Sequence, residues 1–191
     1  MMNRREALKN STLIAGYTFL VGAGISSVSS CKVDNTPSWV PEYLTQEQSD
    51  LVAEIAERII PKTDTPGAKD AMVHRFIDAN VRDNFTPEQQ AMFAEALKIF
   101  DVKSQESHQK NFVNITDDQK DEILNSLHKE SIAYAESNPG EPHVFPVMKD
   151  MTAFGYFTSE VGATQFLKFD PIPGELIGCV PLSEIGGTWA L

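Results

Sequence analysis

Apolar residues recur every three or four positions through most of the chain, the spacing that places them on one face of an α-helix. Alternating apolar and polar runs, which are typical of half-buried strands, are nearly absent. The helical stretches are about 46–60, 68–83, 87–109, 117–136 and a fifth that begins near Pro146, with Gly155 and Gly162 as candidate breaks. The pattern predicts an all-α fold, a small helical bundle of about five helices.

Three of the predicted helices begin with the same polar signature. In each, a Thr is followed three residues later by a Gln, namely Thr45 with Gln48, Thr86 with Gln89 and Thr116 with Gln119. The Thr hydroxyl can accept a hydrogen bond from an early backbone N–H, and the Gln can reach back to the backbone of the Thr, which forms a capping box. These motifs predict where helices start and carry no functional signal.

The helical pattern stops at Phe169. From there on, Pro and Gly recur too often for a long regular element, yet apolar residues remain frequent. Residues 169–191 are therefore expected to be an irregular, extended tail that packs on its own bundle or on another chain. The last part of the chain is poor in charge and rich in aromatic rings, as interface cores and domain cores both are. We favour a partner interface, and its predicted residues are Phe154, Tyr156, Phe157, Phe169, Cys179 and Trp189.

The first thirty residues have the composition of an export signal. Arg4, Arg5 and Lys9 precede a weakly polar apolar run over about 13–28, which several Gly, Ser and Thr residues dilute. The adjacent Arg4 and Arg5 are similar to the paired arginines of the twin-arginine export motif. We therefore predict a signal peptide at 1–30 rather than a retained membrane helix.

Cys31 follows Val28-Ser29-Ser30, a stretch similar to the lipobox at which bacterial lipoproteins are cleaved and lipidated. Lipidation would make Cys31 the first residue of an exported, periplasmic, membrane-anchored lipoprotein, and plain cleavage nearby is the alternative. Residues 31–44 are predicted to be a tether, and residues 45–191 the helical domain.

The charge balance excludes one class of partner. The chain has 16 Lys and Arg against 27 Asp and Glu, and loss of residues 1–30 removes three basic groups and one acidic group. The formal net charge thereby moves from −11 to −13. A body this acidic is repelled by phosphate backbones, so nucleic acid is not expected as a partner. The mean hydropathy of −0.24 and the charged share of 23% are those of a globular domain.

Motifs for catalysis, cofactor binding or metal binding are missing from the sequence, so we assign no residue to these roles. No Gly-x-Ser-x-Gly elbow is present, and the Gly pair at 22–24 lies in the export signal without a third Gly. His74 and Asp78 lie four residues apart on one predicted helix face, with Asp64 nearby in sequence, but no second ligand pair accompanies them. A local hydrogen bond between His74 and Asp78 on a solvated face is the favoured interpretation.

Cysteine usage is sparse. If Cys31 is lipidated, Cys179 is an unpaired thiol in an oxidising compartment. The apolar neighbours of Cys179 favour a buried, inert thiol, and a bridge to another chain is the alternative.

Three stretches of the chain carry a family resemblance. They are the export motif, the run Ile59-Ile60-Pro61 to Thr65-Pro66-Gly67-Ala68 followed by Val73-His74-Arg75-Phe76-Ile77-Asp78, and the run Phe154-Gly155-Tyr156-Phe157-Thr158-Ser159-Glu160. Together they resemble the gluconate 2-dehydrogenase subunit 3 family, and the resemblance extends from about Leu51 to Ile185.

The resemblance implies a small, exported companion of a large flavoprotein of the glucose-methanol-choline type, often beside a cytochrome c. FAD and the substrate would then reside on the flavoprotein, and this chain would lend its export signal to that partner. The principal hypothesis is thus a non-catalytic subunit of a membrane-associated, FAD-dependent sugar or sugar-acid dehydrogenase. The alternatives are a stand-alone lipoprotein adaptor and a subunit that contributes His74, Asp64 or Asp78 to a shared active site.

Overall fold

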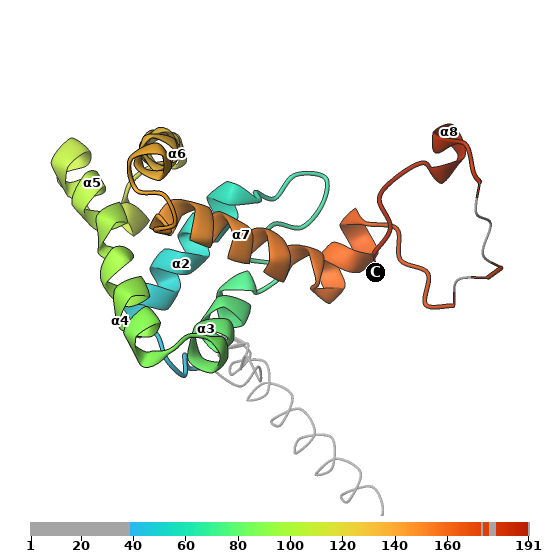
Figure 1. The fold of residues 1–191 in the computed structure, drawn as a ribbon, viewed down its shortest axis with the longest axis horizontal. Coiled ribbons are helices and arrows are strands. Elements are labelled where there is room, and N and C mark those ends of the chain that lie inside the picture. The colour runs from blue at the N-terminus through green and yellow to red at the C-terminus, as the bar shows by residue number, and fades with distance from the viewer. Residues whose placement is uncertain (1–38, 173, 176–178, 191) are drawn as a thin grey trace, which may run out of the picture. The chain divides into compact units, whose positions relative to one another are not determined.

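A computed structural model of the chain describes residues 39–172, 174–175 and 179–190. Within these ranges the fold is all-α, as the sequence predicts, and contains no strand (Figure 1). The elements are α2 (Gln46–Ile59), α3 (Val73–Asn84), α4 (Pro87–Ala96), α5 (Lys98–His108), the 3₁₀ turn η1 (Phe112–Asn114), α6 (Asp117–Ser137), α7 (Val144–Phe157), the π-helical turn η2 (Gly162–Phe166) and α8 (Leu182–Ile185). The predicted export signal at 1–30, with Arg4 and Arg5, the lipidation site Cys31 and tether residues 32–38 lie outside the described residues.

All three predicted capping boxes are present. The Thr hydroxyl accepts from the backbone N–H of the Gln, and the Gln side chain accepts from the backbone N–H of the Thr, at the starts of α2, α4 and α6. The nitrogen-to-hydroxyl distances are 3.2, 3.3 and 3.4 Å, and the return bonds measure 3.0, 2.9 and 3.0 Å. Each box satisfies backbone donors that a helix start leaves open, which explains why these boundaries were predictable.

The second helix starts at Val73 rather than near residue 68. Residues 68–72 form turns instead, because the backbone N–H of Ala68 donates to the carbonyl of Ile60 at 3.0 Å and so ties this segment to the preceding loop. Met72, just before α3, has a φ of +54° and completes the change of direction.

The single helix expected over 87–109 is divided at Leu97 into α4 and α5. The N–H of Phe100 donates to the carbonyl of Leu97 at 3.3 Å, a three-residue step that tightens the chain locally. Because the chain bends there, Phe93, Leu97 and Phe100 all reach the core.

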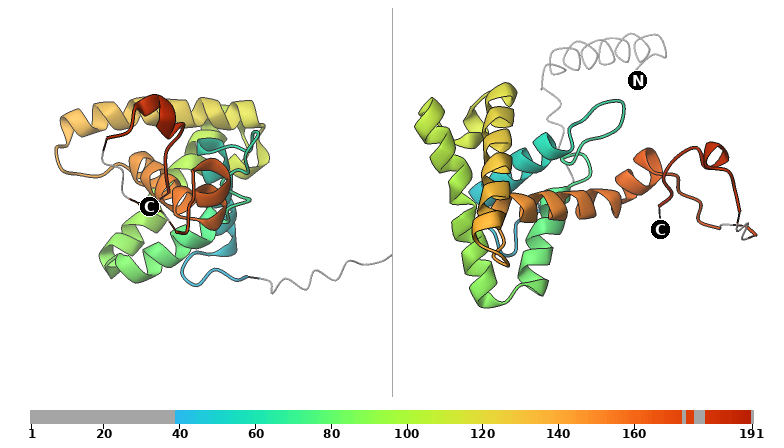
Figure 2. Two further views of the ribbon diagram at one scale, coloured as in Figure 1. Left: turned by 90° about the vertical axis from the view of Figure 1, so that its right-hand side faces the viewer. Right: turned by 45° about the horizontal axis from the view of Figure 1, so that its top comes forward.

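The core lies where α2, α3, α6 and α7 pack together, with α7 running across the other helices (Figures 1 and 2). Each of these helices contributes one apolar stripe to the core, as the periodicity predicts. Fully buried members are Val52 and Ile55 of α2, Ile77 of α3, Leu127 of α6, and Met148 and Tyr156 of α7. Among the described helices, none combines the length and apolar content that crossing a membrane requires.

Ion pairs fasten α6 to α2 beside this core. Arg58 donates to the carboxylate of Asp121 through two nitrogens and lies 3.2 Å from a carboxylate oxygen of Asp117. The buried ammonium of Lys120 lies 2.9 Å from the carboxylate of Glu54. A buried charge needs such a partner, because leaving it unpaired costs several kcal/mol of stability.

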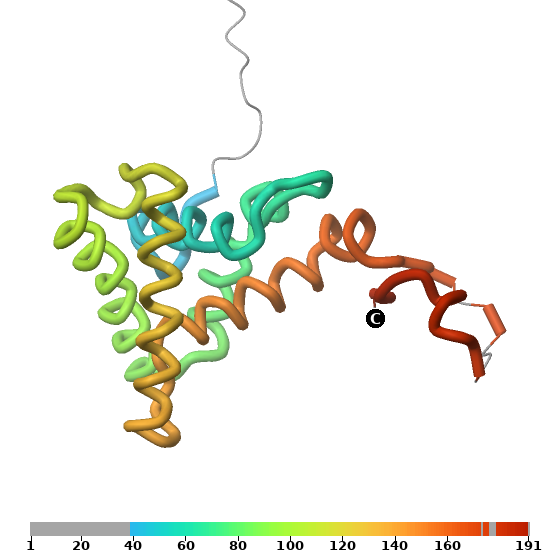
Figure 3. Tube along the Cα trace, turned by 90° about the horizontal axis from the view of Figure 1, so that it is seen from above, coloured from blue at the N-terminus to red at the C-terminus, as the bar shows by residue number. Residues whose placement is uncertain are grey.

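The residues beyond α7 extend away from the helices (Figures 1 and 3). The described residues between 168 and 190 are irregular apart from the short helix α8, and nearly all of them are exposed. A bridge between Lys168 and Trp189 closes the loop at its base. The predicted Pro/Gly-rich extension is therefore present, and its described residues do not pack on their own bundle.

Candidate partner interface

Aromatic rings are exposed around the carboxyl-terminal end of α7. Phe154 is 63% exposed, and its ring centroid lies 5.7 Å from that of Phe76 on α3. Phe157 and Phe166 are exposed as well, with centroids 5.4 Å apart. We call Phe154, Phe157 and Phe166 the aromatic surface. The sequence prediction named the first two and omitted Phe166, although Phe166 lies in the same aromatic-rich stretch.

Tyr156 lies in the core, which corrects its assignment to the interface. Its side chain is fully buried, and its hydroxyl donates to the carbonyl oxygen of Pro66 at 2.6 Å. Adjacent residues on a helix point about 100° apart, so Tyr156 faces inward while Phe157 faces outward. The two rings contact edge to face at 5.4 Å, so Tyr156 supports the aromatic surface from beneath.

The tail adds two further rings. Phe169 and Trp189 are about half exposed, and a groove of about 630 Å³ runs between them and Phe157 at the end of α7. Cys179 is also exposed, which corrects the interpretation of Cys179 as a buried thiol. A bridge from Cys179 to another chain stays a prediction.

The loop that joins α2 to α3 lies beside the end of α7, where the Tyr156 hydroxyl binds the carbonyl of Pro66 (Figure 3). The carboxylate of Glu57 accepts the backbone N–H groups of Lys62 and Lys69 at 3.0 and 2.8 Å, which pins both sides of the loop. A Cβ atom at Gly67 would lie 2.5 to 2.6 Å from the Glu57 carboxylate oxygens and 2.6 Å from the Lys62 nitrogen. A glycine is therefore required at residue 67 for the loop to approach α2 this closely.

The residues considered for a shared active site have other roles or positions. Asp78 is buried, and its carboxylate accepts backbone N–H groups of residues 42, 43 and 44 at 2.8, 3.1 and 2.7 Å. These bonds engage both carboxylate oxygens of Asp78, so the solvated polar face expected for Asp78 and His74 is corrected to a buried carboxylate on the side of Asp78. Asp64 is exposed on the loop between α2 and α3. Asp78 is thus a clasp that fixes the end of the tether to α3, and its oxygens are not available to a substrate.

The protonation state of His74 and the spacing of possible ligands bear on acid–base and metal chemistry in this region. Burial is the largest cause of the lowered pKa of His74, and the positive charge of Arg75 is the second. The imidazole of His74 is therefore neutral at neutral pH. In the part of the chain that the structure describes, no group of three His, Cys, Asp or Glu side chains is arranged to hold a metal ion.

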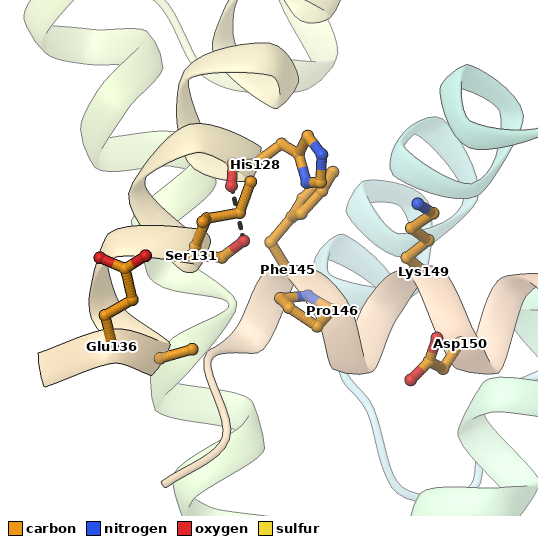
Figure 4. Close-up of a pocket in the computed structure, with 9 residues that line it drawn as sticks. His128, Ser131, Glu136, Phe145, Pro146, Lys149 and Asp150 are labelled. Atoms are coloured by element: carbon orange, nitrogen blue, oxygen red, sulfur yellow. Dashed lines mark hydrogen bonds between the residues drawn. The ribbon is translucent and has the colours of Figure 1, made fainter. Parts of the chain in front are cut away.

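A separate hollow of about 560 Å³ lies between α6 and α7 (Figure 4). The ring of His128 lies over Phe145 with centroids 5.6 Å apart, and Lys149 extends from α7 on the same side. The hydroxyl of Ser131 donates to the backbone carbonyl of His128 at 2.7 Å rather than to the imidazole. Ser131 and His128 are therefore not arranged as the hydrogen-bonded nucleophile and base that covalent catalysis uses.

An all-α domain with an exposed aromatic surface and an exposed tail is typical of a protein that works bound to another chain. A family comparison identifies the class. The model of the family described as gluconate 2-dehydrogenase subunit 3 matches residues 46–174, and the chain belongs to this family. The family name denotes a subunit of a gluconate dehydrogenase complex, so an accessory role in a dehydrogenase agrees with it. No curated protein and no solved structure matches the chain.

Proposed function

We propose that this chain is a non-catalytic small subunit of a membrane-associated, FAD-dependent sugar or sugar-acid dehydrogenase similar to gluconate 2-dehydrogenase. FAD and the substrate would be bound by a large flavoprotein partner, with a cytochrome c as a further candidate member. This chain would serve the export, the stability and the anchoring of that partner. Membership of the subunit 3 family supports the subunit role.

The observation that carries the proposal is the aromatic surface. Single exposed apolar side chains are normal, but rings in mutual contact on one exposed surface mark a site of association. Phe157 and Phe166 are in such contact, and Phe154 lies on the same helix as Phe157. Because buried Tyr156 and the pinned loop support these rings, the surface is formed before a partner binds, which lowers the entropic cost of association.

Export and anchoring rest on the amino-terminal residues. Arg4 and Arg5 would direct twin-arginine export, and a lipid on Cys31 would hold the mature protein at the periplasmic face of a membrane. The Asp78 clasp fixes residues 42–44 to the bundle. The tether between the lipid and the clasp would then span residues 31–41, which reach at most about 40 Å when fully extended. The domain would therefore stay close to the bilayer while bound to its partner.

The direct test is to purify the tagged protein in mild detergent from its host membranes, identify bound chains by mass spectrometry and record a flavin absorbance spectrum. We expect a stoichiometric flavoprotein with bound flavin. A lone, colourless lipoprotein would contradict the proposal and favour the stand-alone adaptor.

Two matched variants locate the contact. Phe154→Ser with Phe157→Ser is expected to leave the helical circular dichroism spectrum unchanged and to abolish flavoprotein recovery. Met92→Ser with Val102→Ser removes apolar side chains of similar exposure from α4 and α5, and it should retain the flavoprotein. Equal loss in both variants would mean that the aromatic surface is not the contact.

The anchor is tested separately. Cys31→Ala should move the assembled complex from the membrane fraction to the soluble periplasmic fraction without dissociating it. Retention in the membrane of a Cys31→Ala complex from which residues 1–30 have been removed, as mass spectrometry of the chain would show, would contradict lipid anchoring through this chain.

A further inference from the structure

We propose that Lys168 closes the tail into a preformed docking arm, and that this arm binds an apolar surface rimmed by Lys and Arg on the large partner. The arm consists of the described residues 167–172, 174–175 and 179–190. The inference rests on the proposed function and adds to it the chemistry of the partner surface.

Lys168 joins the two limbs of the arm through both its backbone and its side chain. Its N–H donates to the carbonyl of Thr188 at 2.9 Å, and its carbonyl accepts the N–H of Ala190 at 2.8 Å. Its ammonium donates to the carbonyl of Ile185 and lies 5.6 Å from the centroid of the Trp189 ring. One residue thus closes a loop that otherwise has little contact with the bundle.

Gly186 is adapted to this closure. Its φ of +70° is readily adopted by glycine and ends α8. A Cβ atom at Gly186 would also lie 2.8 Å from the ammonium nitrogen of Lys168. The backbone at this residue therefore leaves room for the Lys168 side chain to reach Ile185.

The closed arm presents apolar side chains to solvent. Ile172 and Leu182 are 83% and 84% exposed, and Phe169 and Trp189 are about half exposed. The groove beside Phe157 makes the arm continuous with the aromatic surface. Exposed apolar area of this extent is unfavourable in water, at roughly 25 cal/mol per Å², so the arm has the properties of a surface that another protein covers.

The charges of the arm indicate what kind of protein surface would bind it. Asp170, Glu175 and Glu184 are exposed, and within the described chain none of them has an ion pair. Lys168 is the basic residue of the arm, and its ammonium is already engaged by Ile185 and Trp189. A second copy of this chain, with a predicted mature net charge of −13, would be repelled. The complementary occupant is a different chain with an apolar depression and a basic rim.

The test reverses the acidic rim in the assembled complex. Glu175→Lys with Glu184→Lys should weaken binding of the flavoprotein about tenfold and flatten the dependence of binding on salt. Glu106→Lys with Glu122→Lys makes the same change of net charge at exposed residues of α5 and α6, and should alter binding by less than about twofold. Equal weakening in both variants, or no weakening in either, would overturn the basic rim.

A second variant tests the closure by Lys168. Lys168→Met keeps the aliphatic stem and removes the ammonium, so we expect faster proteolysis within 168–190 and weaker flavoprotein binding, with the unfolding midpoint of the bundle unchanged. Unaltered proteolysis and binding would overturn the role of Lys168.

Two outcomes with the unmodified protein are also decisive. A wild-type chain that forms tail-dependent dimers in light scattering would make a second copy the occupant, and would overturn the inference alone. A wild-type chain that recovers no flavoprotein would overturn the proposed function and this inference together.

Discussion

Two Pro/Gly-rich segments near the end of α7 have opposite relations to the bundle. The loop over residues 61–72 is pinned from within the domain, because Glu57 binds both of its sides and Tyr156 binds the carbonyl of Pro66. The tail over residues 169–190 is closed on Lys168, and its described apolar side chains remain in solvent. Both segments are rich in Pro and Gly. Among their described residues, only those of the loop have hydrogen-bonding partners on the helices of the bundle.

A third segment supports this interpretation. Residues 138–143, which join α6 to α7, contain two Pro and a Gly and are held by side chains at each end. The amide of Asn138 donates to the carbonyl of Tyr134 at 3.1 Å, and the Tyr134 hydroxyl donates to Glu141 at 2.9 Å. An irregular segment is thus fixed where the bundle supplies partners for it, and a segment without them is free to bind another chain.

The largest expected contrast is between Tyr156 and Trp189. Tyr156→Ala removes a fully buried ring and its bond to Pro66, so it should lower the free energy of unfolding by about 3–5 kcal/mol. Trp189→Ala should lower it by less than about 0.5 kcal/mol, because Trp189 is half exposed outside the core. Chemical denaturation followed by circular dichroism measures both values. Similar losses in the two variants would show that the tail is part of the folded core.

Two glycines sharpen the comparison further. Gly67→Ala places a methyl group against Glu57 and the Lys62 backbone, so we expect a destabilisation of about 1–3 kcal/mol. Gly174→Ala, in the tail, has open space around the new methyl group and should be neutral within about 0.5 kcal/mol. Thermal unfolding of the two variants gives the ranking, and a neutral Gly67→Ala would mean that the loop can move away from α2.

A smaller difference in unfolding free energy is expected between two carboxylates that accept backbone N–H groups, Glu57 from the loop and Asp170 from the tail. Glu57→Gln replaces one acceptor oxygen by a donor amide and weakens two backbone bonds, so a loss of about 1 kcal/mol is expected. Asp170→Asn changes a carboxylate that accepts one exposed bond, from the N–H of Ile172 at 3.0 Å, and should leave the unfolding free energy unchanged. Hydrogen exchange at the Lys62 and Lys69 amides should rise in Glu57→Gln, and unchanged exchange there would contradict the pinning.

The features predictable from sequence are those with local causes. The starts of α2, α4 and α6 follow from a Thr and a Gln three residues apart, so no knowledge of the remaining chain was required. The Asp78 clasp was not predictable, because its partners are backbone groups of residues 42–44, more than thirty residues away along the chain. Burial of Tyr156 depends in the same way on the path of the loop that contains Pro66.

The site was predictable in part for a related reason. Aromatic enrichment indicated the correct end of the chain, but it could not separate Phe154, which points outward, from Tyr156, which points inward. The exposure of Cys179 contradicts the inference from its apolar neighbours, because those neighbours belong to a tail that does not enter the core. Apolar composition predicts that a segment will pack against protein. Three-dimensional structure is needed to show whether it packs on its own domain or is left exposed for another chain.

The smallest expected effect concerns pH and the third segment, where His143 caps α7. Its Nδ1 accepts the N–H of Phe145 at 3.2 Å, and burial lowers the pKa of His143 below 6.5, against a smaller opposing effect of Glu130. The unfolded chain therefore binds a proton at His143 more readily than the folded chain does. The contribution of His143 to the free energy of unfolding is complete above pH 6.5 and is lost as the pH falls below it.

His143→Asn keeps a capping acceptor without a titrating proton. Between about pH 7 and pH 5 its unfolding free energy should fall less than that of the wild type. His74, whose pKa is also lowered by burial, adds a loss of the same sign in both proteins, so a His74→Gln background isolates His143. If the two pH profiles coincide in that background, the Nδ1 bond does not hold the start of α7.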